Sequence, residues 1–111
     1  MKKVKPITIK IKQIERVSEG AAWWLERIYG KEINIASLAD LRALHKHVKL
    51  YKISEAIGTD EQRLDYSRKA RQYSVARGNL TPYEGGIEVY SAMTFYAFAK
   101  VYLIDGSVKN A

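Results

Sequence analysis

The chain has 111 residues, 47% of them hydrophobic, and a net charge of +7, which suits one domain, 1–111, with enough apolar side chains to bury a core. It contains no cysteine, so disulfide bonds, thiolate metal sites and a cysteine nucleophile are excluded. The lack of cysteine also favours a reducing compartment, and we expect a cytoplasmic protein.

The first predicted element is a strand near the N-terminus. Residues 1–12 carry five lysines and no acid, and apolar and polar side chains alternate from Ile7 to Lys12. A period of two with β-branched residues is typical of a strand, and a helix beginning at Pro6 is the alternative. We expect a strand or an extended basic arm. A lone strand needs a partner, either from elsewhere in this chain or from a second copy.

Residues 13–29 are predicted to form a helix that ends at Gly30, where a C-terminal cap is expected. Gly20 weakens the middle of this segment, so the regular part can begin at Ser18. Apolar residues recur along it at spacings of three and four, which predicts a single core-facing stripe. The stripe consists of Ile14, Val17, Ala21, Trp24 and Ile28.

The next helix is predicted to begin after Ser37, which forms a capping box with Asp40 in place of the usual Glu or Gln. Its apolar face comprises Leu41, Leu44, Val48 and Tyr51. The apolar stripe then moves to Leu50, Ile53 and Ile57. A shift of this kind indicates a kink or a break near residue 50.

Two further helix starts follow Gly58. Thr59 and Gln62 form a capping box, and the helix after them is predicted to run to about Arg77, before Gly78. Residues 81–84, Thr-Pro-Tyr-Glu, combine a capping threonine with a proline at the first helical position, which predicts another helix.

The segment from Ile87 to Ile104 is apolar on nearly every face. Its uninterrupted apolar runs are shorter than the ~20 residues that span a bilayer, so we expect no membrane insertion. We predict a buried central helix that turns to extended chain at 101–104, and a frayed tail at 106–111. The elements together predict a mainly α, single-domain bundle of four or five helices with a short N-terminal strand or extended arm.

The sequence carries no pattern that indicates an enzyme. His45 and His47 stand two residues apart, which on a helix places them on nearly opposite sides, so they cannot share a metal ion. There is no Gly-x-Ser-x-Gly elbow, no phosphate-binding loop and no dinucleotide fingerprint. Glu84 and Glu88 can share a helix face, but such pairs more often form a solvated surface. We expect a non-enzymatic protein without a cofactor or a metal.

Positive charge is clustered, which favours polyanionic partners, although a charge of this size also serves solubility alone. Residues 42–52 contain four lysines and arginines and no acid, and residues 63–77 contain five basic residues against Asp65. The predicted contact surface for nucleic acid or another partner consists of Arg42, Lys46, Lys49, Lys52, Arg63, Tyr66, Arg68, Arg71, Tyr73 and Arg77.

Residues 53–67 resemble a helix-turn-helix motif. In that resemblance Ile53 and Ile57 hold the first helix, Gly58 forms the turn, and Leu64 anchors a second helix that enters the DNA major groove. An ordinary helix connection in a bundle has the same pattern.

The helix after this turn places arginines and tyrosines on one face. Arginine binds phosphates and guanine, and tyrosine stacks on bases, so this face is typical of nucleic-acid contact. The alternative interpretation makes Tyr66, Ala70 and Tyr73 a core stripe bordered by solvated arginines.

The leading hypothesis is therefore non-enzymatic binding of DNA or RNA by a small regulator. The alternative is a small viral or mobile-element inhibitor or adaptor that binds a host protein, where positive charge meets acidic patches. A third possibility is a structural subunit of an assembly. An unpaired strand and a helix that is apolar all round also predict a homodimer.

Overall fold

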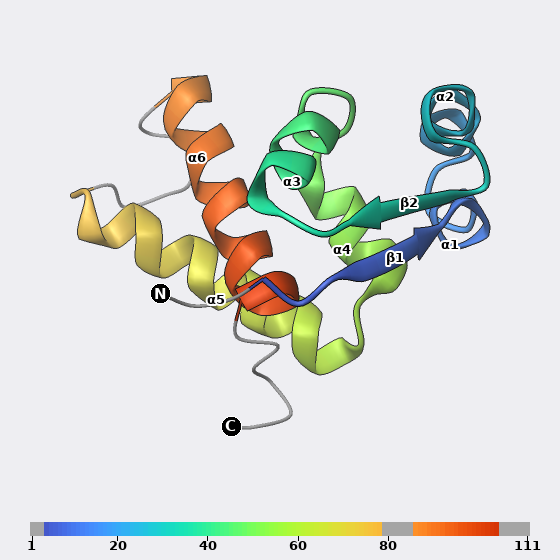
Figure 1. Cartoon of the computed structure of the whole chain (residues 1–111). Coiled ribbons are helices and arrows are strands. Elements are labelled where there is room, and N and C mark those ends of the chain that lie inside the picture. Colours follow the sequence, from blue (N-terminus) through green and yellow to red (C-terminus); the bar gives the residue numbers. More distant parts are fainter. Residues whose placement is uncertain (1–3, 79–85, 105–111) are drawn as a thin grey trace.

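The computed structural model describes residues 4–78 and 86–104. Within these residues, six α-helices and a terminal π-helix accompany a two-stranded sheet (Figure 1). In chain order the elements are β1 (Ile7–Lys10), α1 (Ile11–Glu15), α2 (Glu19–Tyr29), β2 (Glu32–Ile35), α3 (Leu38–His45), α4 (Leu50–Ile57), α5 (Asp60–Ala76), α6 (Gly86–Phe98) and the π-helix η1 (Ala99–Ile104). The prediction of a mainly helical bundle with a short N-terminal strand is confirmed.

The N-terminal strand finds its partner within the chain. β1 pairs antiparallel with β2, so that Ile7 lies opposite Ile35 and Ile9 opposite Ile33. Three of these isoleucines are buried, which fixes the register of the short sheet. The strand ends at Lys10, earlier than the alternation suggested, because α1 begins at the next residue. Because β1 is paired within the chain, it needs no strand from a second copy. The strand therefore gives no support to the predicted self-association.

The predicted helix 13–29 is divided into α1 and α2. The second helix begins after Ser18, whose hydroxyl accepts a hydrogen bond from the Ala21 N–H at 3.2 Å. The predicted apolar stripe is wrong for three of its members, because Val17, Trp24 and Ile28 are exposed. The break lets α2 rotate relative to Ile14, and α2 packs instead through the buried residues Ala22 and Leu25.

The central helices begin where their capping residues predict. The Ser37 hydroxyl accepts from the Asp40 N–H at 3.1 Å, and the Asp40 carboxylate accepts from the Ala36 N–H at 2.8 Å. Thr59 and Gln62 form a complete capping box at the start of α5. The predicted break near residue 50 is confirmed, because α3 ends at His45 and α4 begins at Leu50.

α6 and η1 form a largely apolar column that packs against α4 and α5. Met93, Ala97 and Val101 are buried, as expected for a buried central helix, whereas Tyr96 is half-buried. The predicted change to extended chain at 101–104 is wrong, because a π-helix continues to Ile104. In the described part of the chain, no helix has both the length and the hydrophobicity needed to cross a bilayer. The predicted helix start at 81–84 and the tail at 106–111 lie outside the described residues.

Candidate binding groove

The predicted contact surface is divided between two parts of the molecule. Arg42 lies on α3, Lys46 and Lys49 lie in the connection to α4, and all three are exposed. Lys52 on α4 is half-buried, as are Arg63 and Tyr73 on α5, whereas the other arginines of α5 are exposed. Those exposed arginines are Arg68, Arg71 and Arg77.

The helix-turn-helix resemblance does not extend to its anchor residue. Leu64 is 53% exposed, whereas Tyr66 is 8% exposed and belongs to the core. The buried face of α5 is set by Tyr66, Ala70 and Ser74, and a residue two positions before Tyr66 points away from that face. Burial raises the pKa of the Tyr66 phenol. The core-stripe interpretation therefore describes Tyr66 and Ala70, and Tyr66 cannot stack on a base from this position.

The start of α5 is poorly suited to phosphate. Its first turn carries Asp60 and Glu61. The Arg63 guanidinium forms an ion pair with Asp60 and donates a hydrogen bond to the Gly58 carbonyl at 3.2 Å. Two carboxylates at the end of the helix that would enter the major groove repel a polyanion.

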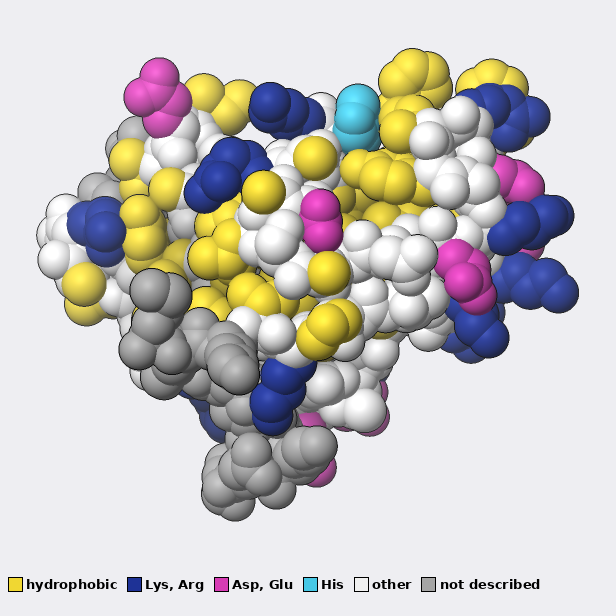
Figure 2. All heavy atoms as spheres, viewed as in Figure 1, with side chains coloured by type: hydrophobic (Ala, Val, Ile, Leu, Met, Phe, Trp, Pro, Cys, Tyr) yellow, Lys and Arg dark blue, Asp and Glu magenta, His cyan; other side chains and the backbone are white. Residues whose placement is uncertain are grey.

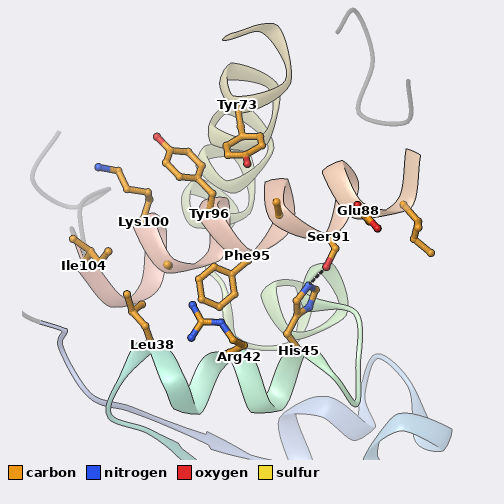
Figure 3. A pocket seen from close by; sticks show the side chains of 13 residues that line it. Leu38, Arg42, His45, Tyr73, Glu88, Ser91, Phe95, Tyr96, Lys100 and Ile104 are labelled. Carbon is orange, nitrogen blue, oxygen red and sulfur yellow. Dashed lines mark hydrogen bonds between the residues drawn. The ribbon is translucent and has the colours of Figure 1, made fainter. Parts of the chain in front are cut away.

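A groove of about 890 Å³ runs along α6 and η1, with α3 on one side and Tyr73 of α5 on the other. Figure 2 shows hydrophobic side chains exposed over α6 and α3, with lysine and arginine side chains beside them. Ile87, near the start of α6, is 84% exposed. The side chains that line the groove include Leu38, Arg42, Tyr73, Phe95, Tyr96 and Ile104 (Figure 3).

Tyr73, Phe95 and Tyr96 line this groove, and Figure 3 shows Arg42 beside Phe95. The Arg42 guanidinium lies 5.2 Å from the centre of the Phe95 ring. The rings of Tyr73 and Tyr96 lie 5.2 Å apart, and the Arg77 guanidinium covers Tyr73 at 3.5 Å. Cation–π contact holds each guanidinium against a ring while leaving part of its edge free to bind an anion.

His45 and Ser91 form a polar contact at the edge of the groove. Their Nε2 and Oγ atoms share a hydrogen bond at 2.7 Å (Figure 3). Burial lowers the pKa of His45, and the nearby backbone polar groups of Ser91 and Val48 act in the opposite direction. Ser91 lies inside α6, where helical hydrogen bonds occupy the backbone N–H groups that an oxyanion hole would need. The pair thus resembles a structural contact more than a catalytic dyad.

Positively charged side chains lie at the edges of the groove. Arg42 and Lys100 line it, and Lys49 lines an adjoining hollow together with Ile87 and Tyr90. Glu88 is the one acidic residue among the described residues that line the groove. Arg42, Lys46 and Lys49 form no ion pair with any described residue. The groove therefore combines an apolar floor with a positive rim.

Of the predicted contact residues, Arg42 and Tyr73 line this groove, whereas the groove-lining residues Phe95 and Tyr96 were not among them. Phe95 and Tyr96 lie on a helix that is apolar on nearly every face, so no periodic signal separates their side from the buried side.

Among residues 4–78 and 86–104, no three acidic or histidine side chains converge as metal ligands would. No known protein family, curated protein or solved structure matches this chain.

Proposed function

We propose that the protein is a non-enzymatic docking module that binds an acidic amphipathic helix of a partner protein in the groove along α6 that α3 and Tyr73 of α5 border. The proposal is based on the groove, whose floor includes Phe95 and Tyr96 and whose positive rim includes Arg42. A concave apolar site with a few convergent polar groups is the usual form of a binding site.

The length of the groove suits a helix. Its lining residues on α6 and η1 extend from Ile87 to Ile104, which is about 25 Å at a rise of about 1.5 Å per residue. A helix of four to five turns has that length and can place one apolar stripe in such a groove. Phe95 and Tyr96, both half-buried, would lose their remaining solvent contact to that stripe.

The charge of the rim selects the kind of helix. Arg42 and Lys49 stand beside the apolar floor without a carboxylate partner among the described residues. A helix with Glu or Asp next to its apolar stripe would supply those partners, and a lysine-rich helix would be repelled. Electrostatic complementarity therefore favours an acidic partner.

Nucleic-acid binding remains a second candidate. Lys46, Lys49, Arg68 and Arg71 have no ion pair with a described residue, which leaves them available to phosphates. Tyr73 and Tyr96 could stack on unpaired bases, as aromatic side chains do in proteins that bind single strands. The acidic first turn of α5 argues against reading of duplex DNA by that helix.

The test uses two synthetic peptides, each about 18 residues long to match the groove, with the same apolar stripe but with glutamates or lysines on the polar face. Fluorescence anisotropy measures their affinity for the intact protein. Ala92 is exposed and lines the groove, so Ala92→Glu adds bulk and negative charge there. The matched control, Gln72→Glu, places the same side chain at an exposed position of α5 that does not line the groove.

We expect the acidic peptide to bind and the basic peptide not to bind. Ala92→Glu should weaken the acidic peptide at least about tenfold, which is about 1.4 kcal/mol, and Gln72→Glu should not. The proposal fails if both peptides bind equally, if neither binds, or if Ala92→Glu and Gln72→Glu have the same effect.

A further inference from the structure

A second surface, on α2, exposes two tryptophans. Trp23 is 58% exposed and Trp24 is 49% exposed. They lie on the side of α2 opposite to Ala22 and Leu25, which are buried in the core. A tryptophan can bury about 150–250 Å², so this face leaves much apolar area in water. α2 stands at the opposite end of the molecule from α6 (Figure 1), and hydrophobic side chains reach the surface at its position in Figure 2.

We propose that α2 pairs with α2 of a second copy in an antiparallel, twofold arrangement centred on Trp23. Glu19 and Arg27 lie four residues before and four residues after Trp23 on the same helix. An antiparallel pair centred on Trp23 therefore places Glu19 of each copy beside Arg27 of the other. Twofold symmetry forms this ion pair twice and brings the two Trp23 rings together.

The side chains on this face are placed for such a pairing. The Arg27 guanidinium lies 3.8 Å from the centre of the Trp23 ring and donates a hydrogen bond to the Trp23 carbonyl at 2.9 Å. These contacts hold Arg27 on the exposed face, and Glu19 forms no ion pair with a described residue. Gly20 also lies on this side, and a Cβ there would meet nothing within 4 Å, so a second helix can approach closely.

The charges around the tryptophans favour a second copy over a polyanion. The exposed side chains of α1, α2 and the connection between them include Lys12, Glu15, Arg16, Glu19 and Arg27. Because both signs are interspersed, this end of the molecule attracts neither nucleic acid nor an acidic protein strongly. A surface with balanced charge and self-complementary spacing is what an isologous interface requires. The area is small, so we expect a weak dimer with a dissociation constant of roughly 1–100 µM.

The test is sedimentation velocity over a concentration series, with charge-reversed variants. Glu19→Arg alone replaces each intermolecular ion pair by two arginines, and Arg27→Glu alone replaces it by two glutamates, so each variant should be monomeric. An equimolar mixture of the two variants restores both ion pairs across one heterodimer and should sediment as a dimer. The double replacement Trp23→Ala with Trp24→Ala should also be monomeric.

Controls separate interface effects from folding effects. Both charge reversals oppose the dipole of α2, so circular dichroism must show that each variant is folded, and recovery in the mixture cannot come from better folding. Leu64→Ala removes another exposed apolar side chain, on α5, and should leave the dimer unchanged. A wild-type protein that stays monomeric well above the expected range, at about 500 µM, or a mixture that stays monomeric, overturns the proposal. The outcome of the sedimentation experiment does not depend on whether the groove binds a peptide, because α2 does not line the groove.

Discussion

The hydroxyl groups of Tyr102 and Ser54 lie 2.8 Å apart in the core and join η1 to α4 across 48 residues of sequence. Gly58, at the end of α4, lies directly beside this contact. A Cβ atom on Gly58 would overlap the Tyr102 hydroxyl and the Ser54 carbonyl. Gly58 therefore has a second role besides the turn that the sequence predicts. It lets α4 pack closely against Tyr102, because only a residue without a side chain fits there.

Replacement of Gly58 by alanine should destabilise the fold by about 1–3 kcal/mol, because the added methyl group overpacks a filled region. Urea unfolding measures the change. Gly20→Ala is the matched control, since its Cβ would meet nothing within 4 Å, and it should not destabilise the protein. Equal losses in the two variants would show that close packing at Gly58 is not the cause.

The two phenylalanines of α6 should differ in their effect on stability. Phe98 is fully buried and its ring centre lies 4.6 Å from that of Tyr102, so Phe98→Ala should cost about 3–5 kcal/mol. Phe95 is half-buried in the groove, and Phe95→Ala should cost clearly less. Denaturant unfolding of both variants checks the order, and a larger loss for Phe95→Ala would contradict the deeper burial of Phe98.

Local signals in the sequence predicted the starts of α3 and α5 correctly. Ser37 and Thr59 cap α3 and α5 because a capping hydrogen bond joins residues that are three apart, and sequence displays such pairs directly. The pairing of β1 with β2 was not predicted, because residues 32–35 form only a short strand whose role depends on a partner far away in the sequence. Strand pairing is set by tertiary contacts that no local pattern contains.

The exposed and buried faces were predicted less well than the helices. A stripe drawn through residues 13–29 assumes one continuous helix, and the break before Ser18 changes which side of α2 meets the core. For the same reason the sequence places Trp24 in the core, whereas it lies on the surface. On α6 the floor of the groove could not be identified, because Phe95 and Phe98 look alike in an all-apolar segment and only the position of α3 distinguishes them.

Stability should depend on pH through His45. Burial lowers its pKa in the folded protein below the ordinary value of 6.5. Between the lowered pKa and about pH 6.5 the unfolded chain binds a proton that the folded protein does not, so stability is fully present above that window and falls as the pH is lowered through it. Urea unfolding between about pH 5 and 7.5 should show this fall, and His45→Gln should reduce the slope. Identical slopes for the wild type and His45→Gln would exclude His45 as a source.

The two candidate functions should differ in their response to salt. Phosphate contacts release condensed counterions, so nucleic-acid affinity falls steeply with salt, whereas an apolar stripe in the groove keeps most of its affinity. We expect Lys46→Ala with Lys49→Ala to lower the salt slope for a single-stranded probe by about 0.7 units for each phosphate that the variant no longer neutralises. Arg68→Ala with Arg71→Ala is the matched pair on α5.

These exposed replacements should change the free energy of unfolding little. Binding of the acidic peptide at about 300 mM salt, with no retardation of single-stranded or duplex probes at about 50 mM salt, would support protein docking and remove the nucleic-acid candidate. Retardation with a steep salt slope that only the Lys46 and Lys49 replacements reduce would place nucleic acid beside the groove. The same reduction in slope from the Arg68 and Arg71 replacements would instead place it on the outer face of α5, because those arginines do not line the groove.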